Sequence, residues 1–299
     1  AYVQEIDHNR LVFNSTITQD PRGPQARVIF YDRSFDALSP HFYTQGNQEP
    51  VNNPDSDRSI RPAIEQANLT AYWLTRTDDR RPILNGEWGM SRFEWPNMLP
   101  LYTDEGLVYQ QTNPDLADLS VTMAEDVAIM RTVLLSGFAS GQFGTPLRIS
   151  TEELGFRTGF VDVGGGTILP LFNGFILSDD MRAVGEAIGQ LEESASIDWA
   201  SFSPDPLTGR IVATADDGQV LLPFGSADAS QAIIYLLQDT RERTGQVENG
   251  RITIDGLDAD ALYDITFFDP ESPATPTSSV TGVFSSDGSV RFDVPTFTQ

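Results

Sequence analysis

A glutamate next to a short apolar segment is the residue of this chain best suited to chemistry. The segment spans residues 82–89 and reads PILNGEWG, directly after Arg80 and Arg81. The pattern predicts a buried strand that stops at a glycine and presents Glu87 at its carboxyl end, as the strands of parallel barrels present catalytic groups. A carboxylate there can attack or stabilise an oxocarbenium-like centre, while the neighbouring Trp88 stacks on a sugar ring. The same pattern also fits a strand that ends with an ordinary surface glutamate of no catalytic role.

The segments around this glutamate alternate between strand-like and helix-like patterns. Strands are predicted at residues 11–15 and 36–43, and helices at residues 60–75 and 119–135. The second helix leads into a glycine-rich segment, residues 137–149, and a long aromatic-rich loop follows Glu87. Strand, helix, strand, helix is the order of a parallel sheet with crossover helices.

The pattern changes after about residue 200. Seven short strands are predicted there, separated by turn-forming pairs such as Asp217-Gly218, Asn249-Gly250 and Asp287-Gly288. The seven strands are residues 210–214, 219–223, 233–238, 251–254, 263–268, 280–284 and 290–294. No long helix is predicted between them, which favours an antiparallel sandwich. An acid-started amphipathic helix at residues 178–195 connects the two parts. The predicted domains are residues 1–198 and 199–299.

Composition excludes several classes of function. The 299 residues carry a formal charge of −24, and all 19 basic residues are arginine. Nucleic acid is therefore not an expected partner, since no basic surface would neutralise phosphates. The absence of cysteine excludes disulfides, cysteine-based metal sites and thiol catalysis. No apolar run reaches membrane-spanning length and no signal peptide is visible, so no membrane partner is expected. Dispersed carboxylates suit a saline environment.

Taken in order, these segments resemble the second half of a (β/α)8-barrel retaining glycoside hydrolase, of the agarase or porphyranase kind. Residues 2–12 resemble the helix and fifth strand of such a barrel, and residues 36–43 resemble its sixth strand with a terminal His and Tyr. Residues 81–89 resemble the seventh strand, which carries the nucleophile, and residues 132–141 the last helix and the approach to the eighth strand. Residues 256–270 are similar to the β-sandwich that follows many such barrels. The resemblance implies an α/β barrel portion, strands five to eight, followed by an all-β sandwich domain.

The resemblance also implies roles for particular side chains. Glu87 would be the nucleophile, and His41 and Tyr43 would hydrogen-bond substrate hydroxyls and orient Glu87. Trp88 and Trp95 would line sugar subsites. A structural role is the other interpretation of His41. No metal and no cofactor are implied.

A departure from the family concerns the proton donor. Asn14, at the end of the predicted fifth strand, could reach the cleft but is no acid. Glu94 is the carboxylate nearest to Glu87, yet both belong to one loop, whereas a retaining pair flanks the bond at about 5–5.5 Å. The family's acid/base is a glutamate at the end of the fourth strand, which would precede Ala1. The expected partner is therefore the N-terminal half of the same enzyme, since an open half-barrel exposes apolar edges.

A glycine-rich motif supports a competing interpretation. Asp162-Val163-Gly164-Gly165-Gly166-Thr167 resembles the phosphate loop of the actin, sugar-kinase and heat-shock ATPases, whose backbone N–H groups approach a phosphate. The second phosphate loop and the adenosine-binding glycine pair of those proteins are not found. The motif should also open a β-hairpin, and Pro170 is expected to interrupt that hairpin. A third class is a non-catalytic carbohydrate-binding or structural protein.

The substrate class follows only from the resemblance and the charge. An acidic, lysine-free surface is compatible with a marine algal polysaccharide such as a galactan, and with a secreted or periplasmic location. A sulfated substrate would require arginines such as Arg92, Arg131 or Arg148 in the cleft.

Overall fold

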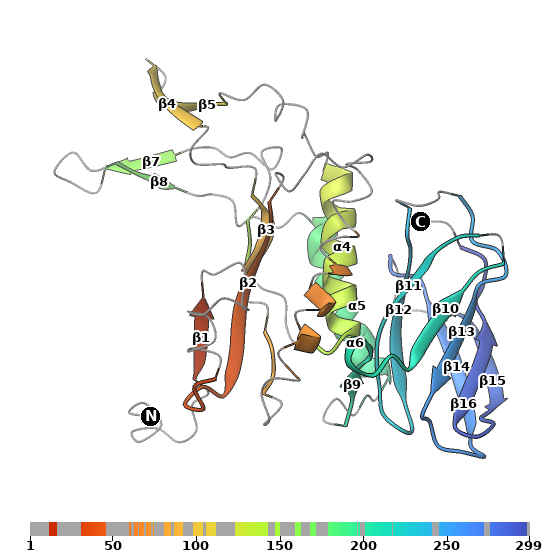
Figure 1. Cartoon of the computed structure of the whole chain (residues 1–299). Coiled ribbons are helices and arrows are strands. Elements are labelled where there is room, and N and C mark those ends of the chain that lie inside the picture. Colours follow the sequence, from red (N-terminus) through yellow and green to blue (C-terminus); the bar gives the residue numbers. More distant parts are fainter. Residues whose placement is uncertain are drawn as a thin grey trace.

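The fold is described from a computed structural model of the chain (Figure 1). The described residues are 12–16, 31–45, 60, 63–64, 66–68, 70–72, 74, 81–84, 87–91, 98–103, 106–111, 123–142, 147–149, 159–162, 168–171, 179–195, 197, 201–216, 218–240, 245–271 and 276–297. Within them, one sheet is parallel and the other sheets are antiparallel.

The parallel sheet has four strands, β1 (Phe13–Thr16), β2 (Ala37–Gln45), β3 (Glu87–Ser91) and β6 (Leu147–Ile149). They lie in the order β1-β2-β3-β6, and each neighbouring pair is parallel. The strands predicted at residues 11–15 and 36–43 are thus present, and both extend beyond the predicted carboxyl ends. In the described part of the chain the sheet is open, with β1 and β6 at its edges, so the half-barrel stays a prediction.

One helical segment packs on this sheet, and two longer helices follow it in the chain. Residues 60–74 are helical wherever they are described, and α5 (Asp179–Ala195) matches the helix predicted at residues 178–195. The helix predicted at residues 119–135 is shifted, since α4 spans Met123–Ala139. No helix among the described residues has both the length and the apolar character needed to cross a bilayer.

The shift of α4 has a structural cause. Gly137 was expected in a glycine-rich approach to a strand, but it lies inside the helix. A Cβ at this position would lie 2.5 Å from Gln142 Oε1 and 3.0 Å from Gln66 Nε2, so the glycine allows close packing rather than ending the helix. The helix ends at Ala139, and the chain turns at Gly141, whose φ of 83° belongs to the left-handed region that glycine favours after a helix.

Two β-hairpins follow the strands of the parallel sheet. After β3 come β4 (Met98–Thr103) and β5 (Gly106–Gln111), and after β6 come β7 (Gly159–Asp162) and β8 (Ile168–Leu171). Both hairpins lie beyond the end of the sheet at which β3 ends (Figure 1). The segment after Glu87, predicted as a loop, therefore contains a hairpin.

The C-terminal region is antiparallel throughout its described residues. It contains β9 (Ser203–Pro204), α6 (Asp205–Thr208), β10 (Ile211–Thr214), β11 (Leu221–Ala227), β12 (Ala232–Gln238), β13 (Arg251–Asp255), β14 (Leu262–Phe268), β15 (Pro276–Phe284) and β16 (Ser289–Asp293). Sheets β10-β13-β16 and β12-β11-β9 accompany the β14-β15 hairpin. All seven predicted strands are present within a few residues of their predicted bounds. The sandwich arrangement itself stays a prediction.

The core of this region follows the alternation of its strands. Buried and exposed residues alternate along β13 and β16, as expected for strands with one covered face. The buried residues form one apolar cluster of Ile211, Ile252, Ile254, Leu257, Val290 and Phe292. Asp287 and Gly288 both have positive φ between the bridged Ser286 and Ser289, which is the tight hairpin turn expected from the sequence.

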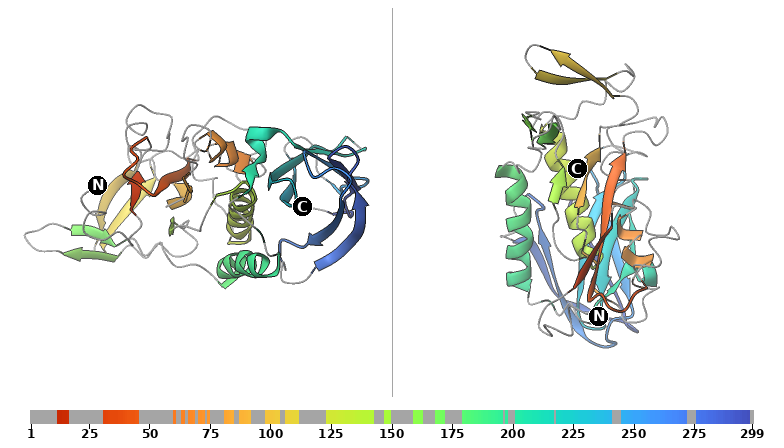
Figure 2. Two further views of the ribbon diagram at one scale, coloured as in Figure 1. Left: turned by 90° about the horizontal axis from the view of Figure 1, so that it is seen from below. Right: turned by 90° about the vertical axis from the view of Figure 1, so that its left-hand side faces the viewer.

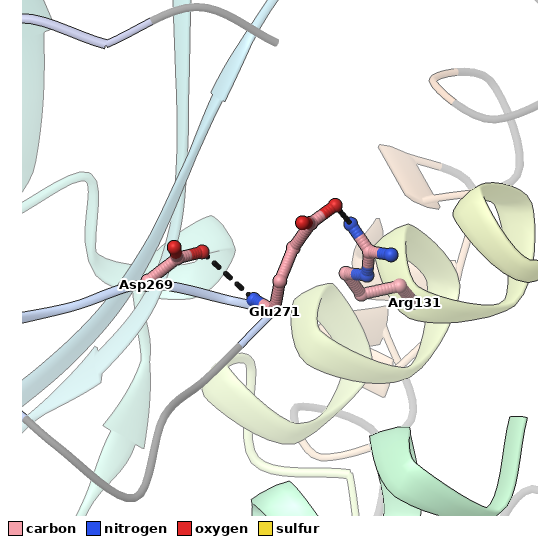
Figure 3. Close-up of polar contacts among 3 residues, drawn as sticks. All are labelled: Arg131, Asp269 and Glu271. Carbon is pink, nitrogen blue, oxygen red and sulfur yellow. Dashed lines mark hydrogen bonds and ion pairs between the residues drawn. The ribbon is translucent and has the colours of Figure 1, made fainter. Parts of the chain in front are cut away.

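A second cluster joins the two parts of the molecule. Ile60, Ala63 and Ala67 pack against Phe224 of β11 and Leu237 of β12. Polar contacts add to this interface, which the helices form between the two sheet regions (Figures 1 and 2). Ser226 Oγ donates to Ala139 O at 2.7 Å, and Arg131 on α4 pairs with Glu271 beyond β14 (Figure 3). The C-terminal strands are therefore packed onto the helical layer.

Candidate functional site

Glu87 and His41 occupy adjacent backbone positions in the parallel sheet. In the register of β2 and β3, His41 is paired with Glu87, Phe42 with Trp88 and Tyr43 with Gly89. On the other side of β3, Glu87 is paired with Leu147 of β6. The fold thus brings together the positions of two predicted site residues that lie far apart in the sequence, and Tyr43 follows two residues later on the same strand.

The pairing of β2 with the β3 segment shifts by one residue just before this site. Leu38 is bridged to Ile83 in a parallel sense, with Leu38 N–H donating to Pro82 O at 2.9 Å and Leu84 N–H donating to Leu38 O at 2.7 Å. Three steps along β2 lead from Leu38 to His41, whereas four steps lead from Ile83 to Glu87. The register of the two strands therefore differs by one residue between the Leu38–Ile83 bridge and the His41–Glu87 pair.

Leu38 and Ile83, which precede this register shift, are both fully buried and pack with Tyr72 and Leu74 of the helical segment. The two strands are therefore held against the helical segment just before the paired positions 41 and 87.

Two details of the predicted site were wrong. Glu87 was expected where its strand stops, and His41 and Tyr43 where theirs ends. In the structure Glu87 is the first residue of β3, which continues to Ser91, and β2 continues to Gln45. The strand continues because β2 and β6 supply parallel neighbours on both sides of β3.

The remaining predicted residues lie elsewhere. Asn14 is paired with Leu38, three residues before His41 and therefore about 10 Å along the strand direction from the Glu87 level. Trp88 directly follows Glu87 and is paired with Phe42 of β2. Trp95 and Glu94 lie outside the described residues.

Charged side chains near the amino-terminal ends of the strands have structural roles. Arg81, buried before the β3 segment, donates from Nη1 to Asp32 O at 2.7 Å and to Phe35 O at 3.0 Å. Asp36 Oδ2 accepts from Val12 N at 2.8 Å. The backbone N–H and the hydroxyl of Ser34 hold the pKa of Asp32 below its ordinary value. These contacts fix the starts of β1, β2 and β3 relative to one another, and so support the register that places Glu87 beside His41.

The glycine-rich motif lies in a hairpin connection. Asp162 of β7 is paired with Ile168 of β8, so residues 163–167 connect two antiparallel strands. The expectation that Pro170 interrupts this hairpin was wrong, since Pro170 is paired with Phe160. Proline is tolerated in strands whose N–H side is not needed by a neighbour, as in a two-stranded ribbon.

No cluster of three or more His, Asp or Glu side chains suited to a metal ion occurs among the described residues. Comparison of the chain with protein-family profiles, with curated proteins and with solved structures gave no match in any of the three. The function must therefore be argued from the geometry of the site and the chemistry of its residues.

Proposed function

We propose that the chain is part of a retaining glycoside hydrolase that acts on a polysaccharide, with Glu87 as its nucleophile. The observation that supports this proposal best is the register of β2 and β3, in which position 87 is paired with His41. A carboxylate and a histidine at paired positions of neighbouring strands are suited to act on one substrate.

The chemistry assigns one role to each residue. The Glu87 carboxylate attacks the anomeric carbon, the glycosidic C–O bond breaks, and a glycosyl-enzyme ester forms. Water then attacks the same carbon and releases Glu87 as a carboxylate. His41, at the adjacent position, hydrogen-bonds a substrate hydroxyl and orients Glu87. Tyr43, two residues later on the same strand, has the same role.

The proton for the departing oxygen has to come from a second carboxylic acid. In this proposal the acid is a glutamate on the N-terminal half of the same enzyme, whose strands pair with the open edges of the parallel sheet. The negative charge of the chain favours a neutral polysaccharide, such as an algal galactan, in a secreted or periplasmic setting.

The test uses the full-length enzyme and two glutamate variants. Glu87→Gln removes the nucleophile and is expected to lower kcat by about 10⁴-fold or more while substrate binding persists. Glu94→Gln, the matched control at the next glutamate in the sequence, is expected to keep activity within about tenfold of the original enzyme. Equal losses in the two variants, or hydrolysis retained in Glu87→Gln, would contradict the proposal.

Covalent trapping gives an independent measurement. A 2-deoxy-2-fluoroglycosyl fluoride needs little acid assistance because fluoride is a good leaving group, and it leaves the sugar bound to the nucleophile. Peptide mass spectrometry is expected to find the label on Glu87. A label on another carboxylate would assign the nucleophile elsewhere, and binding of oligosaccharide without label or hydrolysis would favour the carbohydrate-binding alternative.

A second candidate function is nucleotide binding at residues 162–167. The observation that favours it is the register of β7 and β8, which closes the glycine-rich segment into a hairpin connection as such phosphate loops require. The test is thermal unfolding with and without MgATP, with Asp162→Asn as the variant. A rise in Tm with MgATP that is lost in Asp162→Asn would support this candidate, and an unchanged Tm would dismiss it.

A further inference from the structure

Arg81 is a buried cation that lies six residues before Glu87. It is 8% exposed, and no other arginine among the residues whose burial the structure describes is buried. Burial of a charge is costly unless the charged group is hydrogen-bonded, so a buried guanidinium points to a specific role. The proposed mechanism gives Arg81 no role of its own.

The Arg81 guanidinium binds the turn that leads into β2. Arg81 Nη1 donates to Asp32 O at 2.7 Å and to Phe35 O at 3.0 Å, so one nitrogen joins both ends of this turn. The next residue, Asp36, is joined to the start of β1. Its N–H donates to Val12 O and its Oδ2 accepts from Val12 N, both at 2.8 Å. Arg81 thus anchors a turn that itself holds two strands.

The backbone hydrogen bonds between β2 and the β3 segment do not define the register by themselves. Directly after Arg81, Leu38 N–H donates to Pro82 O at 2.9 Å, and Leu84 N–H donates to Leu38 O at 2.7 Å. A parallel ladder repeats every two residues, so a shift of two residues would preserve such bonds. The contact of the Arg81 side chain has no such repeat, because the turn at residues 32–35 occurs once. This contact therefore distinguishes the observed register from the shifted ones.

The register at the start of the strands determines which residues meet near the candidate site. His41 follows Leu38 by three residues and Glu87 follows Ile83 by four, so short segments lead from the anchored start to the paired positions. A shift of two residues would move His41 by about 6.6 Å along the strand, beyond the hydrogen-bond reach of about 2.6–3.2 Å. Even a misplacement of about 1 Å can lower a catalytic rate by about 10²-fold.

We propose that Arg81 is a positioning residue of the candidate site, which holds β2 and the β3 segment in the register that pairs His41 with Glu87. Its effect on catalysis rests on the proposed function of Glu87, whereas the register is a property of the fold and is measurable without activity. Packing of Leu38 and Ile83 on the helical segment favours the same register. Loss of the Arg81 contacts is therefore expected to loosen the pair without separating the strands.

Kinetics of the full-length enzyme test the effect on catalysis. Arg81→Met keeps an apolar stem without donors and is expected to lower kcat by about 10- to 100-fold, with KM changed by less than about threefold. Arg81→Lys keeps a charged donor and is expected to recover part of this loss. The control Gly225→Ala overpacks β11 in the C-terminal region, so it is expected to lower the Tm while kcat well below the Tm is unchanged. An unchanged kcat in Arg81→Met, or an equal loss in Gly225→Ala, overturns the positioning role.

Hydrogen exchange tests the register without activity. In Arg81→Met, the backbone amides of residues 41–45 and 87–91 are expected to exchange at least about tenfold faster, while those of the C-terminal strands keep their rates. Gly225→Ala is expected to show the reverse distribution. If Arg81→Met does not fold, Arg81→Lys is expected to show a smaller change in the same amides.

Exchange at residues 41–45 and 87–91 that stays unchanged in a folded Arg81 variant overturns the proposal. A full-length wild-type enzyme that hydrolyses no polysaccharide contradicts the proposed function alone, and the exchange rates then still decide whether Arg81 holds the register.

Discussion

The parallel sheet and the C-terminal strands build their cores in different ways. In the parallel sheet, paired residues come from distant parts of the chain, as when Phe13 pairs with Ala37 and Glu87 pairs with Leu147. In the C-terminal region all described pairs are antiparallel. Some lie close in sequence, such as Leu222 with Leu237, whereas others join distant strands, such as Ile211 with Ile254. Parallel pairs require crossover connections, whereas antiparallel hairpins are closed by short turns. Local pairing forms with less loss of chain entropy, so the β11–β12 and β14–β15 hairpins can order first.

The difference teaches where each region gets its stability. The C-terminal region encloses its own apolar cluster between its strands. The helical segment over the parallel sheet packs in two directions, onto Leu38 and Ile83 of that sheet and onto Phe224 and Leu237 of the C-terminal region. The strands that carry the candidate site therefore pack on a helical segment that also packs on the C-terminal region.

The largest expected effect on stability comes from a cavity in the cluster that joins the helical segment to the C-terminal strands. Leu237 is fully buried in the cluster that joins β11 and β12 to the helical segment. Leu237→Ala leaves a cavity there and is expected to lower the free energy of unfolding by about 2–5 kcal/mol. If the layer is shared, near-ultraviolet and far-ultraviolet circular dichroism should report one common, lowered transition.

The control for this change is a leucine of the same region that contacts little. Leu262 is 69% exposed, so Leu262→Ala is expected to change stability by no more than about 0.5 kcal/mol. If Leu237→Ala instead splits the melt into two transitions, with one of them unshifted, the two regions fold independently and the comparison above is wrong.

The next largest effect distinguishes two glycines, one from each part of the molecule. A Cβ on Gly225 of β11 would lie 2.6 Å from Ile211 Cδ1 and 2.9 Å from the backbone oxygen of Ile233. Gly225→Ala is therefore expected to cost about 1–3 kcal/mol through overpacking. Gly189 of α5 has no atom within 4 Å of an added Cβ, so Gly189→Ala should stabilise by about 0.5–1 kcal/mol. Urea titrations measure the change in the free energy of unfolding for both variants. Changes of the same sign would show that the packing around the two glycines does not determine their effects.

A smaller effect concerns acid stability and one turn of the C-terminal region. Burial by itself raises the pKa of Asp228, but hydrogen bonds from Ser201, Ser230 and Gln231 outweigh it and keep the pKa below 3.8. Because the folded pKa lies below the unfolded one, this stabilisation is present above about pH 4 and is lost as the pH falls through the folded value. Ser201→Ala removes one donor and should raise the pKa of Asp228, measured by carboxyl NMR titration. An unchanged titration would mean that Ser201 does not contribute.

The sequence predicts the two regions unequally well, for a physical reason. Turn pairs such as Asp287-Gly288 and the period-two pattern mark the C-terminal strands locally, so all seven were predictable. Gly137 was misread because it packs close to Gln66, which is distant in sequence, and to Gln142 just beyond the helix. The pairing of position 87 with His41 depends on the register of two strands that are distant in sequence. Residue types thus predicted the candidate site, but only the pairing of distant strands could place it.

The smallest expected effect concerns the ion pair across the two regions. Arg131 Nη1 lies 2.6 Å from Glu271 Oε1, and Asp269 Oδ1 accepts from the backbone N–H of Glu271 (Figure 3). Glu271 is 68% exposed, so solvent screens the pair, and Glu271→Gln is expected to cost no more than about 1 kcal/mol. The loss should shrink at about 1 M salt, since exposed pairs are screened there. The matched variant Asp293→Asn breaks the pair with Arg251 inside the C-terminal region. Similar small losses at both pairs would show that apolar packing, rather than charge, joins the two regions, whereas a loss of several kcal/mol at Glu271 alone would assign that role to the ion pair.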